Sequence, residues 1–515
     1  PGFAAALIGR VLESRGYRVG LISQPDWHSA DAFKALGRPR LAALITAGNL
    51  DSMLNEKTAA RKFRSRDSYS PGGETGHRPE RATIVYANRM REAYKDVPII
   101  IGGIEASLRR FAHYDYWSNK VRHSILLDSK ADILSYGMGE HSIVEIADAL
   151  AEGKSVAEMY DIRGICYVTG KPPVSDKTVV CPSYEAVRDD KAAFAKAFKM
   201  QYEEQDPFYG KTIIQPSENR FVVQTPPALP LSTEEMDAIY ELPFQRRWHP
   251  DYDAAGGVPA LQEVQFSLTS QRGCFGHCHF CAIASHQGRI IQHRSQESLV
   301  RETERMTKLP GFKGYIHDVG GPTANFRHVA CQKQLTDGVC RNRHCIGSET
   351  CRNLNTSHDD YLELLRKIRH VKGVKKVFVR SGLRYDYVLA DGNKEFVKEL
   401  CQYHVSGQLK VAPEHVVKHV TDLMGKADVN AFLTFKDWFD EANRELGKKQ
   451  YLVPYFMSSH PGCTLKDAVS LAEFLRDMHM QPEQVQDFIQ TPGSLSTAMY
   501  YTGINPLTGQ KVYVA

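Results

Sequence analysis

The sequence predicts an α/β protein with two sheets, a doubly wound parallel sheet near the N-terminus and a partial (β/α)6 barrel after it. Two observations predict this class. First, short apolar runs alternate with segments of helical periodicity, both before and after residues 151–257. Second, glycine or polar residues follow most of the apolar runs, as at the ends of strands. Parallel strands need crossover connections, usually helices, so the alternation indicates parallel sheets. We therefore expect domains at 1–150 and 258–515, bridged by 151–257.

The N-terminal domain is expected to lack its first strand, because Pro1 falls within a predicted strand-to-helix connection. Glycines at strand ends, such as Gly102 and Gly103, line the ligand crevice in sheets of this kind, although tight turns are the simpler explanation. Helices are predicted at 3–15 and from 139 to 151. Strands are predicted at 17–23, 41–47, 97–103 and 131–137.

Two further segments have a distinct composition. Arginine runs at 61–66, 78–81 and 89–91 form a basic insertion that could contact phosphates, although a solvated loop is the ordinary explanation. In the bridge, a strand is predicted at 162–168 and a helix at 190–204. A proline-rich linker ends with Ser232 and Glu235, which have the spacing of a helix capping box.

From residue 258 onwards, six strand–helix units predict the partial barrel. The strands are expected at 263–269, 314–318, 376–380, 408–412, 451–456 and 484–489. The helices between them are expected at 297–308, 358–369, 395–404, 429–446 and 465–478. Barrels of this kind carry their sites at the carboxyl ends of the strands, so residues that follow these strands are the functional candidates.

Three cysteines in a C-x3-C-x2-C spacing, Cys274, Cys278 and Cys281, follow the first predicted barrel strand. Three thiolates leave one iron of a 4Fe–4S cube without a protein ligand, and that iron can bind a substrate or cofactor. With the aromatic Phe280 before the last cysteine, the spacing resembles the radical SAM superfamily signature. The resemblance implies reductive cleavage of S-adenosylmethionine (SAM) to a 5′-deoxyadenosyl radical.

The neighbours of these cysteines suit such a cluster. Gly273 and Gly276 allow the backbone to wrap closely around it, and Phe280 would shield it from water. The alternatives are three buried thiols or a zinc loop, in which His277 or His279 supplies a fourth ligand. Structural zinc usually pairs two short cysteine motifs, and only one is present here, which favours the cluster.

The remaining candidate binding residues follow the later barrel strands. Glycines after the second strand would let the backbone approach the methionyl end of SAM, and a basic side chain could pair with its carboxylate. Glu414 could accept hydrogen bonds from the amino group or the ribose. For each charged residue, an ion pair at the barrel rim is the alternative. The candidates are Phe280, Gly320, Gly321, Arg380, Ser381, Arg384, Glu414 and Lys426.

A second cysteine group, Cys331, Cys340, Cys345 and Cys351, lies in a polar insertion at 331–355. The insertion has too little apolar content to fold by hydrophobic burial alone, so four thiolates on a metal would supply its stability. The spacing matches no standard zinc knuckle. A second Fe–S cluster is therefore the first hypothesis, zinc the second and free cysteines the third, with His344 as a spare ligand.

Composition bounds the class of protein. A chain of 515 residues, 42% hydrophobic and 24% charged, is ordinary for a globular protein of two or three domains. Seven of the eleven cysteines fall between Cys274 and Cys351, which favours metal chemistry in a reducing, cytoplasmic compartment over disulfides. No apolar run approaches the length of a membrane span, and a net charge of +5 does not indicate nucleic-acid binding.

Motifs along the whole chain resemble the YgiQ family of radical SAM proteins. The matching stretches are 22–27, 102–107, 226–230, 320–325, 411–415, 459–463 and 491–503. The resemblance implies a Rossmann-like N-terminal domain fused to a SAM-cleaving TIM barrel, with a 4Fe–4S cluster on Cys274, Cys278 and Cys281. It implies no settled reaction, and family members usually continue past the position of Ala515.

Resemblances to two related enzyme groups bear on which cofactors are expected. The barrel motifs are similar to those of radical SAM methylthiotransferases, which hold a second cluster on three cysteines of the N-terminal domain. Here that domain and the bridge contain only Cys166 and Cys181, which argues against methylthio transfer. The Rossmann-like domain also resembles the cobalamin domain of radical SAM methyltransferases. The D-x-H-x-x-G lower-ligand motif is absent, which argues against cobalamin.

We therefore predict a cytoplasmic radical SAM enzyme whose substrate is unidentified, with RNA or a ribosomal protein as candidates. It would need an electron donor such as flavodoxin or ferredoxin, and no membrane partner is expected. The alternative is a protein without SAM chemistry, in which the cluster senses redox state and the basic loops bind RNA or the ribosome. A sensor has no need of SAM-facing strand ends, which favours the enzyme.

Overall fold

The computed structural model describes residues 4–482 and 484–515, and the chain forms two compact units. Unit 1 comprises Pro1–Leu229, Leu242–Gln262 and Gln490–Gln510. Unit 2 comprises Pro230–Glu241, Glu263–Ile489 and Lys511–Ala515. The chain therefore passes between the units several times, and a single cut near residue 258 does not separate them. No helix among the described residues is long and apolar enough to cross a membrane.

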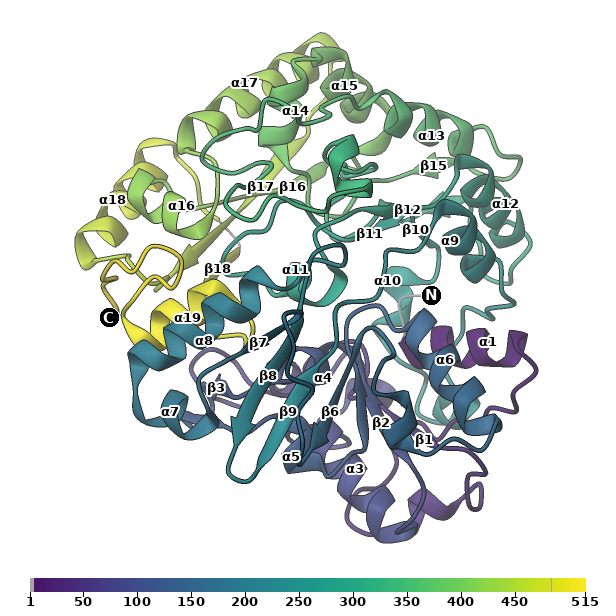
Figure 1. Ribbon diagram of the computed structural model, residues 1–515. Helices are drawn as coiled ribbons and strands as arrows, with labels where there is room; N and C mark the ends of the chain where they lie inside the picture. The colour runs from purple at the N-terminus through teal and green to yellow at the C-terminus, as the bar shows by residue number, and fades with distance from the viewer. Residues whose placement is uncertain (1–3, 483) are drawn as a thin grey trace. The chain divides into compact units, whose positions relative to one another are not determined.

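Unit 1 is built on a mixed seven-stranded sheet with the order β1-β2-β5-β6-β9-β8-β7 (Figure 1). β1, β2 and β5 are parallel, which confirms the strands predicted at 41–47, 97–103 and 131–137. β5–β6, β6–β9 and β9–β8 are antiparallel, whereas β7 and β8 are parallel. The strands are β1 Ala43–Ile45, β2 Ile99–Gly102, β5 Ile133–Ser135, β6 Ile165–Thr169, β7 Thr178–Val180, β8 Thr212–Ser217 and β9 Arg220–Gln224. A separate hairpin joins β3 His113–Asp115 and β4 Lys120–Arg122.

Two expectations for this half differ from the structure. The strand predicted at 17–23 does not form, and Val19 and Leu21 stay exposed, so the run lacks the buried face that sheet pairing needs. The region 151–257, expected to bridge two domains, supplies β6–β9 of the sheet. β6, β8 and β9 pair antiparallel, which needs no crossover helix, so the strand–helix alternation carried no signal for these pairings. β7 and β8 are parallel, and the helix predicted at 190–204 lies between them in sequence.

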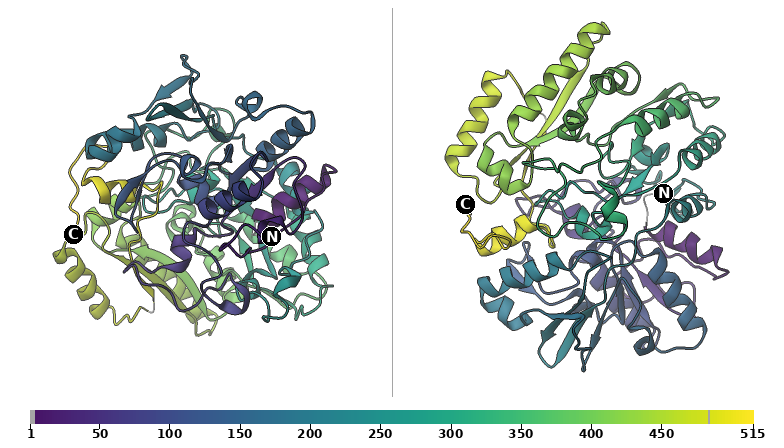
Figure 2. Two further views of the ribbon diagram at one scale, coloured as in Figure 1. Left: turned by 90° about the horizontal axis from the view of Figure 1, so that it is seen from below. Right: turned by 45° about the horizontal axis from the view of Figure 1, so that its top comes forward.

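Helices pack on the sheet and on one another in unit 1. The predicted helices at 3–15, 139–151 and 190–204 are present as α1, α6 and α8, although Phe3 lies outside the described residues. α19 packs along α8, although the two are far apart in sequence (Figures 1 and 2). The helices are α1 Ala4–Ser14, α2 Ser52–Glu56, α3 Ala82–Ala93, α4 Gly103–Leu108, α5 Ile125–Ser129, α6 Glu140–Ala151, α7 Tyr184–Asp189, α8 Lys191–Glu203 and α19 Leu495–Thr502.

Unit 2 contains the six predicted barrel strands in chain order. The parallel pairs β10–β14, β13–β15, β16–β17 and β17–β18 form three short sheets. A parallel bridge from Leu383, which follows β15, to Val411 of β16 connects the second sheet to the third. The strands are β10 Ser267–Thr269, β13 Tyr315–Ile316, β14 Asp318–Gly320, β15 Lys376–Val377, β16 Gln408–Glu414, β17 Tyr451–Ser458 and β18 Gln484–Asp487. A short antiparallel pair, β11 Gln271–Arg272 and β12 Gln292–His293, follows the first strand.

The helices predicted for the barrel form at the expected places. α9 begins with the predicted capping box between Ser232 and Glu235. The helix predicted at 395–404 ends as a π turn, Leu400–His404. The helices are α9 Thr233–Tyr240, α11 Ile283–Gln287, α12 Gln296–Met306, α13 Asp359–Arg369, α14 Tyr385–Asp391, α15 Lys394–Glu399, α16 Lys418–Met424, α17 Val429–Glu445 and α18 Leu465–Asp477; α10, Leu261–Val264, precedes β10.

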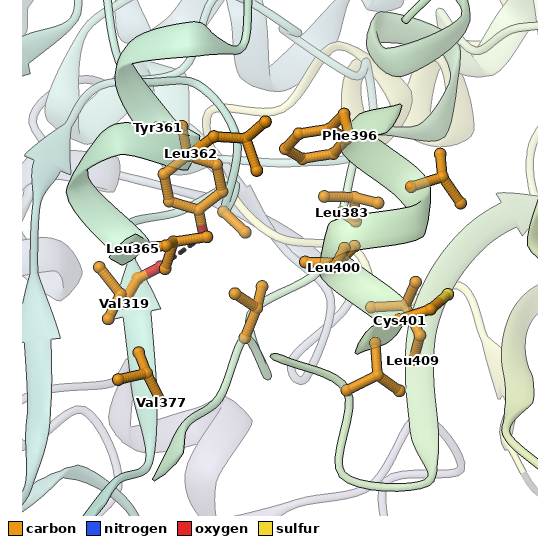
Figure 3. Packing of buried hydrophobic residues seen from close by; sticks show 14 of the residues in the cluster. Val319, Tyr361, Leu362, Leu365, Val377, Leu383, Phe396, Leu400, Cys401 and Leu409 are labelled. Atoms are coloured by element: carbon orange, nitrogen blue, oxygen red, sulfur yellow. Dashed lines mark hydrogen bonds between the residues drawn. The ribbon is translucent and has the colours of Figure 1, made fainter. Parts of the chain in front are cut away.

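The core of unit 2 lies between the strands and these helices (Figure 3). Val319, Leu365, Val377 and Leu409 are almost fully buried in it. Tyr361 places its ring in the same core and donates its hydroxyl hydrogen to the carbonyl of Val319 at 2.7 Å (Figure 3). This packing fixes the strand ends that carry the candidate site.

Candidate functional site

The loop of Cys274, Cys278 and Cys281 leaves β11 and runs into α11, next to the end of the first barrel strand. Two glycines are required by its close packing. Gly273 has φ +84°, and a Cβ there would lie 2.3 Å from the carbonyl oxygen of Ile290. A Cβ on Gly276 would lie 2.4 Å from Nη1 of Arg384. The loop is therefore closely packed against the protein at both glycines, and its wrapping around a cluster stays a prediction.

The three thiols are half-buried and lie within electrostatic range of one another. Burial raises the pKa of the Cys281 thiol to about 12, and the other two cysteines add to the rise. Burial also raises the pKa of Cys274. Thr323 Oγ1 lies 3.8 Å from Cys274 Sγ, and Arg384 donates an N–H to Cys278 Sγ at 3.5 Å. Binding of iron would therefore displace protons from these thiols.

Among the described residues, the three cysteines are not arranged around a single metal ion. Within the described part of the chain, no three His, Cys, Asp or Glu residues converge closely enough to hold one ion. Cysteines on the corners of a cube lie further apart than the ligands of one ion. His279, one of the two expected spare zinc ligands, bonds through Nδ1 to the carbonyl of Leu423 at 2.8 Å, and its Nε2 lies 3.5 Å from Nε2 of His344.

Arg384, one of the predicted partners of the SAM carboxylate, is held by a carboxylate of the protein. It was expected to pair with the SAM carboxylate, but its Nε and Nη2 donate to Asp386 at 2.8 and 2.6 Å in a buried ion pair. Burial alone would raise the pKa of Asp386, but the guanidinium of Arg384 holds that pKa below its usual value. Asn325 bonds both the backbone N–H and the carbonyl of Arg384. Arg384 therefore supports the sulfur of Cys278 from a fixed position.

Arg380 and Ser381, also predicted to bind SAM, are engaged at the rim. The exposed Arg380 guanidinium lies 3.6 Å from Glu263, which is the rim ion pair considered as the alternative. Asp318 accepts the backbone N–H groups of Arg380 and Ser381 at 2.7 and 3.0 Å, and the Ser381 hydroxyl donates to the same carboxylate. These contacts position the chain after β15 rather than leave free donors.

The glycines after β14 are used for packing between strand ends. A Cβ on Gly321 would lie 2.4 Å from the carbonyl oxygen of Gln271, and one on Gly320 would lie 3.1 Å from Oγ of Ser381. The space that a side chain would occupy is therefore filled by the protein itself. These contacts account for the two glycines by packing, and the approach to the methionyl end of SAM stays a prediction.

Glu414 and Lys426 remain as charges without a fixed ion pair. Glu414 ends β16 at an irregularity in the strand pairing and has φ +68°, a left-handed conformation that is strained for a residue with a side chain. Burial raises its pKa, which Lys426 and Arg384 oppose. Lys426 is 3% exposed and forms no ion pair among the described residues. Glu414 also raises the pKa of Cys281, which places it within range of the cysteine loop.

Phe280 lies on the side of the cysteine loop that faces β17 and α16. It packs against Val420, Met424 and Cys463, and its ring is edge-on to that of His460 at 6.3 Å. The predicted shielding of the third cysteine by an aromatic ring is compatible with this packing.

The second cysteine group gathers in an irregular segment. Burial raises the pKa of the Cys345 thiol to about 11; Arg289 opposes this rise, and Cys331, Cys351 and Cys340 add to it. Gln334 donates to Cys345 Sγ at 3.6 Å. Cys345 and Cys351 pack on the same apolar cluster as Cys274. His344, considered a spare ligand, lies instead 3.5 Å from Nε2 of His279.

Sequence reasoning missed three residues that support the site: Thr323, Asn325 and Asp386. Signals for them were present. Thr323 and Asn325 belong to the motif after β14 that was singled out for its glycines, and Asp386 follows Arg384 at a spacing that lets two side chains meet at a helix start.

Comparisons with known proteins give the family and the fold. A family model described as Radical SAM N-terminal matches residues 1–267, and one described as a domain of unknown function (DUF3362) matches 483–514. A UPF0313 protein of Clostridium botulinum (strain Loch Maree / Type A3) is 55% identical over 514 residues, covering 100% of this chain and 80% of that protein. A UPF0313 protein of Clostridium perfringens (strain 13 / Type A) is 55% identical over 513 residues, covering 99% and 78%.

Solved structures of a radical SAM methyltransferase, TsrM from Kitasatospora setae, are similar in fold. One, with a tryptophan substrate and the SAM analog aza-SAM bound, has a TM-score of 0.53 and 14% identity, covering 95% of this chain and 71% of that one. Another, with cobalamin and a [4Fe-4S] cluster bound, has the same TM-score and identity over 94% and 69%. At this identity the likeness concerns the fold alone.

Proposed function

Because this chain belongs to the UPF0313 family, the YgiQ-type radical SAM family, we propose that it is an enzyme that cleaves SAM reductively. A 4Fe–4S cluster on Cys274, Cys278 and Cys281 would supply one electron to bound SAM when reduced. The chemistry that this cluster would supply is one-electron cleavage of the C5′–sulfur bond of SAM, which would give methionine and a 5′-deoxyadenosyl radical able to take a hydrogen atom from a substrate. A donor such as flavodoxin or ferredoxin would provide the electron.

The observation that carries this proposal is the cysteine loop together with the charges around it. Arg384 holds the sulfur of Cys278, and Gly273 and Gly276 leave the space that a close-fitting loop needs. Lys426 is a buried cation without an ion pair, so it suits the SAM carboxylate. Glu414 suits the amino group or the ribose hydroxyls.

The test is anaerobic reconstitution with iron and sulfide, followed by SAM and dithionite. We expect 5′-deoxyadenosine from the wild-type protein and none from the triple variant Cys274→Ala/Cys278→Ala/Cys281→Ala. A wild-type protein that holds an intact cluster and forms no 5′-deoxyadenosine would defeat the proposal.

Lys426→Met should weaken SAM binding by about tenfold or more, because a charge-assisted contact contributes roughly 1.5–3 kcal/mol. Arg380→Met is the matched control, because that arginine is exposed and paired with Glu263, and its SAM affinity should stay within about twofold of wild type. Equilibrium dialysis with SAM measures both. Equal losses in the two variants would remove Lys426 from the SAM site.

For the second cysteine group we propose a second Fe–S cluster, with zinc as the less favoured occupant. Four thiols within range of one another, in a segment with little regular structure, support a bound group that orders the segment. Iron and zinc should be measured on the triple variant that lacks the first site. Retained iron, about four atoms for a cube, supports the cluster; zinc alone supports the alternative, and neither metal contradicts both.

Cobalamin binding and methyl transfer are decided by a separate measurement. The sequence lacks the histidine lower-ligand motif, whereas a TsrM structure of related fold contains cobalamin. We propose that this chain binds none. After incubation with hydroxocobalamin and gel filtration, the protein fractions should show no absorbance from the corrin ring. Co-elution of cobalamin with the protein would overturn this proposal and favour a methyltransferase.

The ion pairs of the basic insertion divide it into two parts. Arg78, Arg81 and Arg91 form ion pairs with Asp67, Asp115 and Asp132, and charges paired in this way have little capacity left for phosphates. Arg61, Lys62 and Arg64 are exposed and form no ion pair among the described residues. RNA or a ribosomal protein therefore stays a candidate substrate, and we advance no separate sensing function.

A further inference from the structure

Unit 1 contains a small cavity of about 40 Å³ that none of the preceding chemistry uses. It lies between the start of β3, the helices α7 and α8 and the N-terminal end of α19, all within unit 1. A single water needs roughly 10–15 Å³ by this measure, so the cavity has room for a group of a few heavy atoms. Much of its wall is apolar, with Leu108, Phe111, Val187, Phe194 and Phe198.

Arg110 is the only charged residue that lines this cavity among the described residues. The side chain is 7% exposed, donates from Nε to Oε1 of Gln224 and from Nη1 to the carbonyl of Ser107, both at 2.5 Å, and lies over the ring of Tyr136. It forms no ion pair in the described part of the chain. Burial of a cation without an anion is costly, so this guanidinium has an unmet need for a negative charge.

The preceding residue shows what a structural arginine looks like here. Arg109 is equally buried, but it forms an ion pair with Asp51, and Glu105 lies within electrostatic range. Two adjacent arginines are therefore both buried, and within the described ranges the one that lines the cavity is the one without a carboxylate partner. A purely structural role does not explain the difference.

Other polar groups near Arg110 also lack partners. Nε2 of Gln224 is buried without a hydrogen-bond partner, although its Oε1 already holds Arg110. Nε2 of His113, which lines the cavity, is likewise unpartnered, and its Nδ1 lies 3.0 Å from the carbonyl of Phe111. The N-terminal end of α19, at Ser494, borders the same cavity and adds the positive end of a helix dipole.

We propose that this cavity binds a small monocarboxylate, whose carboxylate pairs with Arg110 and whose hydrocarbon part lies against Phe111, Phe194 and Phe198. One guanidinium balances one negative charge. A phosphate dianion would leave a second charge facing aromatic and aliphatic walls, which is unfavourable. The site is independent of the cysteine loop, so its test can fail while SAM cleavage stands, and the reverse.

Propionate is the probe, titrated calorimetrically into the full-length reconstituted protein at ionic strength held constant with sodium chloride. We expect saturable binding to wild type, no binding to Arg110→Gln, and no comparable binding of inorganic phosphate. Arg188→Gln, which removes an exposed arginine of the same unit, should bind propionate as wild type does. Circular dichroism establishes that each variant is folded.

Ala498→Leu provides a second variant in case Arg110→Gln fails to fold. Ala498 lines the cavity and is 1% exposed, so a larger side chain fills the space and leaves Arg110 in place. Propionate at millimolar concentration should also raise the thermal midpoint of the wild-type protein above that in equal chloride. No binding to wild type, unchanged binding to both variants, or equal binding of phosphate would each overturn the proposal.

Discussion

The Arg384–Asp386 ion pair shows at the scale of single residues how the site depends on a buried charge. Both side chains are under 10% exposed, and Arg384 also reaches Cys278. Asp386→Asn keeps the shape but leaves a buried guanidinium without its anion. We expect the free energy of unfolding to fall by about 3–5 kcal/mol, measured by anaerobic urea titration.

The matched control is Asp189→Asn. Asp189 pairs with Arg188 at 2.7 Å, but both side chains are about half exposed. Solvent screens such a pair, so we expect a loss below about 1 kcal/mol. If the two variants lose the same stability, the Arg384–Asp386 pair contributes no more than a surface pair.

Glu414 combines a site carboxylate with a strained backbone. At φ +68° a Cβ is disfavoured, whereas glycine tolerates this conformation. Glu414→Gly should therefore be more stable than Glu414→Ala by about 1 kcal/mol, while both lose 5′-deoxyadenosine formation. Thermal unfolding and product analysis measure the two effects. A glycine variant no more stable than the alanine variant would show that the loop relaxes without cost.

At this scale the sequence indicated where the site lies but not how its charges are shared. The cysteine spacing and the glycines of the loop carry local signals; the structure packs both glycines tightly, and the cluster on the three cysteines stays a prediction. The roles of Arg380 and Arg384 depend on Glu263 and Asp386, and such pairings are settled by packing rather than by residue type. Four basic or acidic candidates were named from position alone; of these, Glu414 and Lys426 form no ion pair with any residue that the structure describes.

At the scale of elements, the π turn after α15 ties a helix to the barrel through His404. Its Nδ1 lies 2.8 Å from the carbonyl of Val377, and its own carbonyl accepts the N–H of Val379. Periodicity predicted a continuous helix to His404, because a π turn keeps nearly the same apolar spacing. Because the helix ends in a π turn, His404 bonds the β15 segment both through its side chain and through its backbone carbonyl.

This histidine predicts a pH dependence. Burial lowers the pKa of His404 to about 4, and its side chain is fully buried. In the unfolded chain a histidine titrates near 6.5, so between pH 6.5 and 4 the unfolded state binds more protons and stability falls as pH falls. At pH 5 the cost is about 2 kcal/mol.

His404→Asn should remove this loss, because an asparagine amide can still donate to the carbonyl of Val377. We expect wild type to lose about 2 kcal/mol more than the variant between pH 7 and pH 5, by chemical denaturation at both values. Parallel losses would assign the acid sensitivity to other groups.

At the scale of the whole molecule, each unit is built from segments that are not contiguous in the sequence. The sequence placed everything after residue 258 in the barrel, but Gln490–Gln510 belongs to unit 1. The barrel strands and helices were predictable because each is a local pattern, repeated six times. α19 packs against α8 although about 300 residues separate the two helices in the sequence, and no local sequence pattern encodes such a contact.

This return segment supports the last prediction. The ring of Tyr501 stacks on Tyr114 at 4.6 Å and meets Phe194 edge-on at 4.9 Å, both within unit 1. Burying a half-exposed aromatic ring in such a cluster stabilises by about 2 kcal/mol. Tyr501→Ala should therefore destabilise unit 1, although its position in the sequence lies beyond the last barrel strand.

The two units can be followed separately in one protein. Trp27, Trp117 and Trp248 lie in unit 1 and Trp438 in unit 2, so a Trp438→Phe background leaves tryptophan fluorescence reporting on unit 1 alone. The visible absorbance of the reconstituted cluster reports on unit 2. We expect Tyr501→Ala to lower the fluorescence midpoint and leave the absorbance midpoint unchanged. Tyr513→Ala, an exposed tyrosine of unit 2, should change neither. A drop confined to the absorbance signal would place the stabilising role of this segment in the barrel.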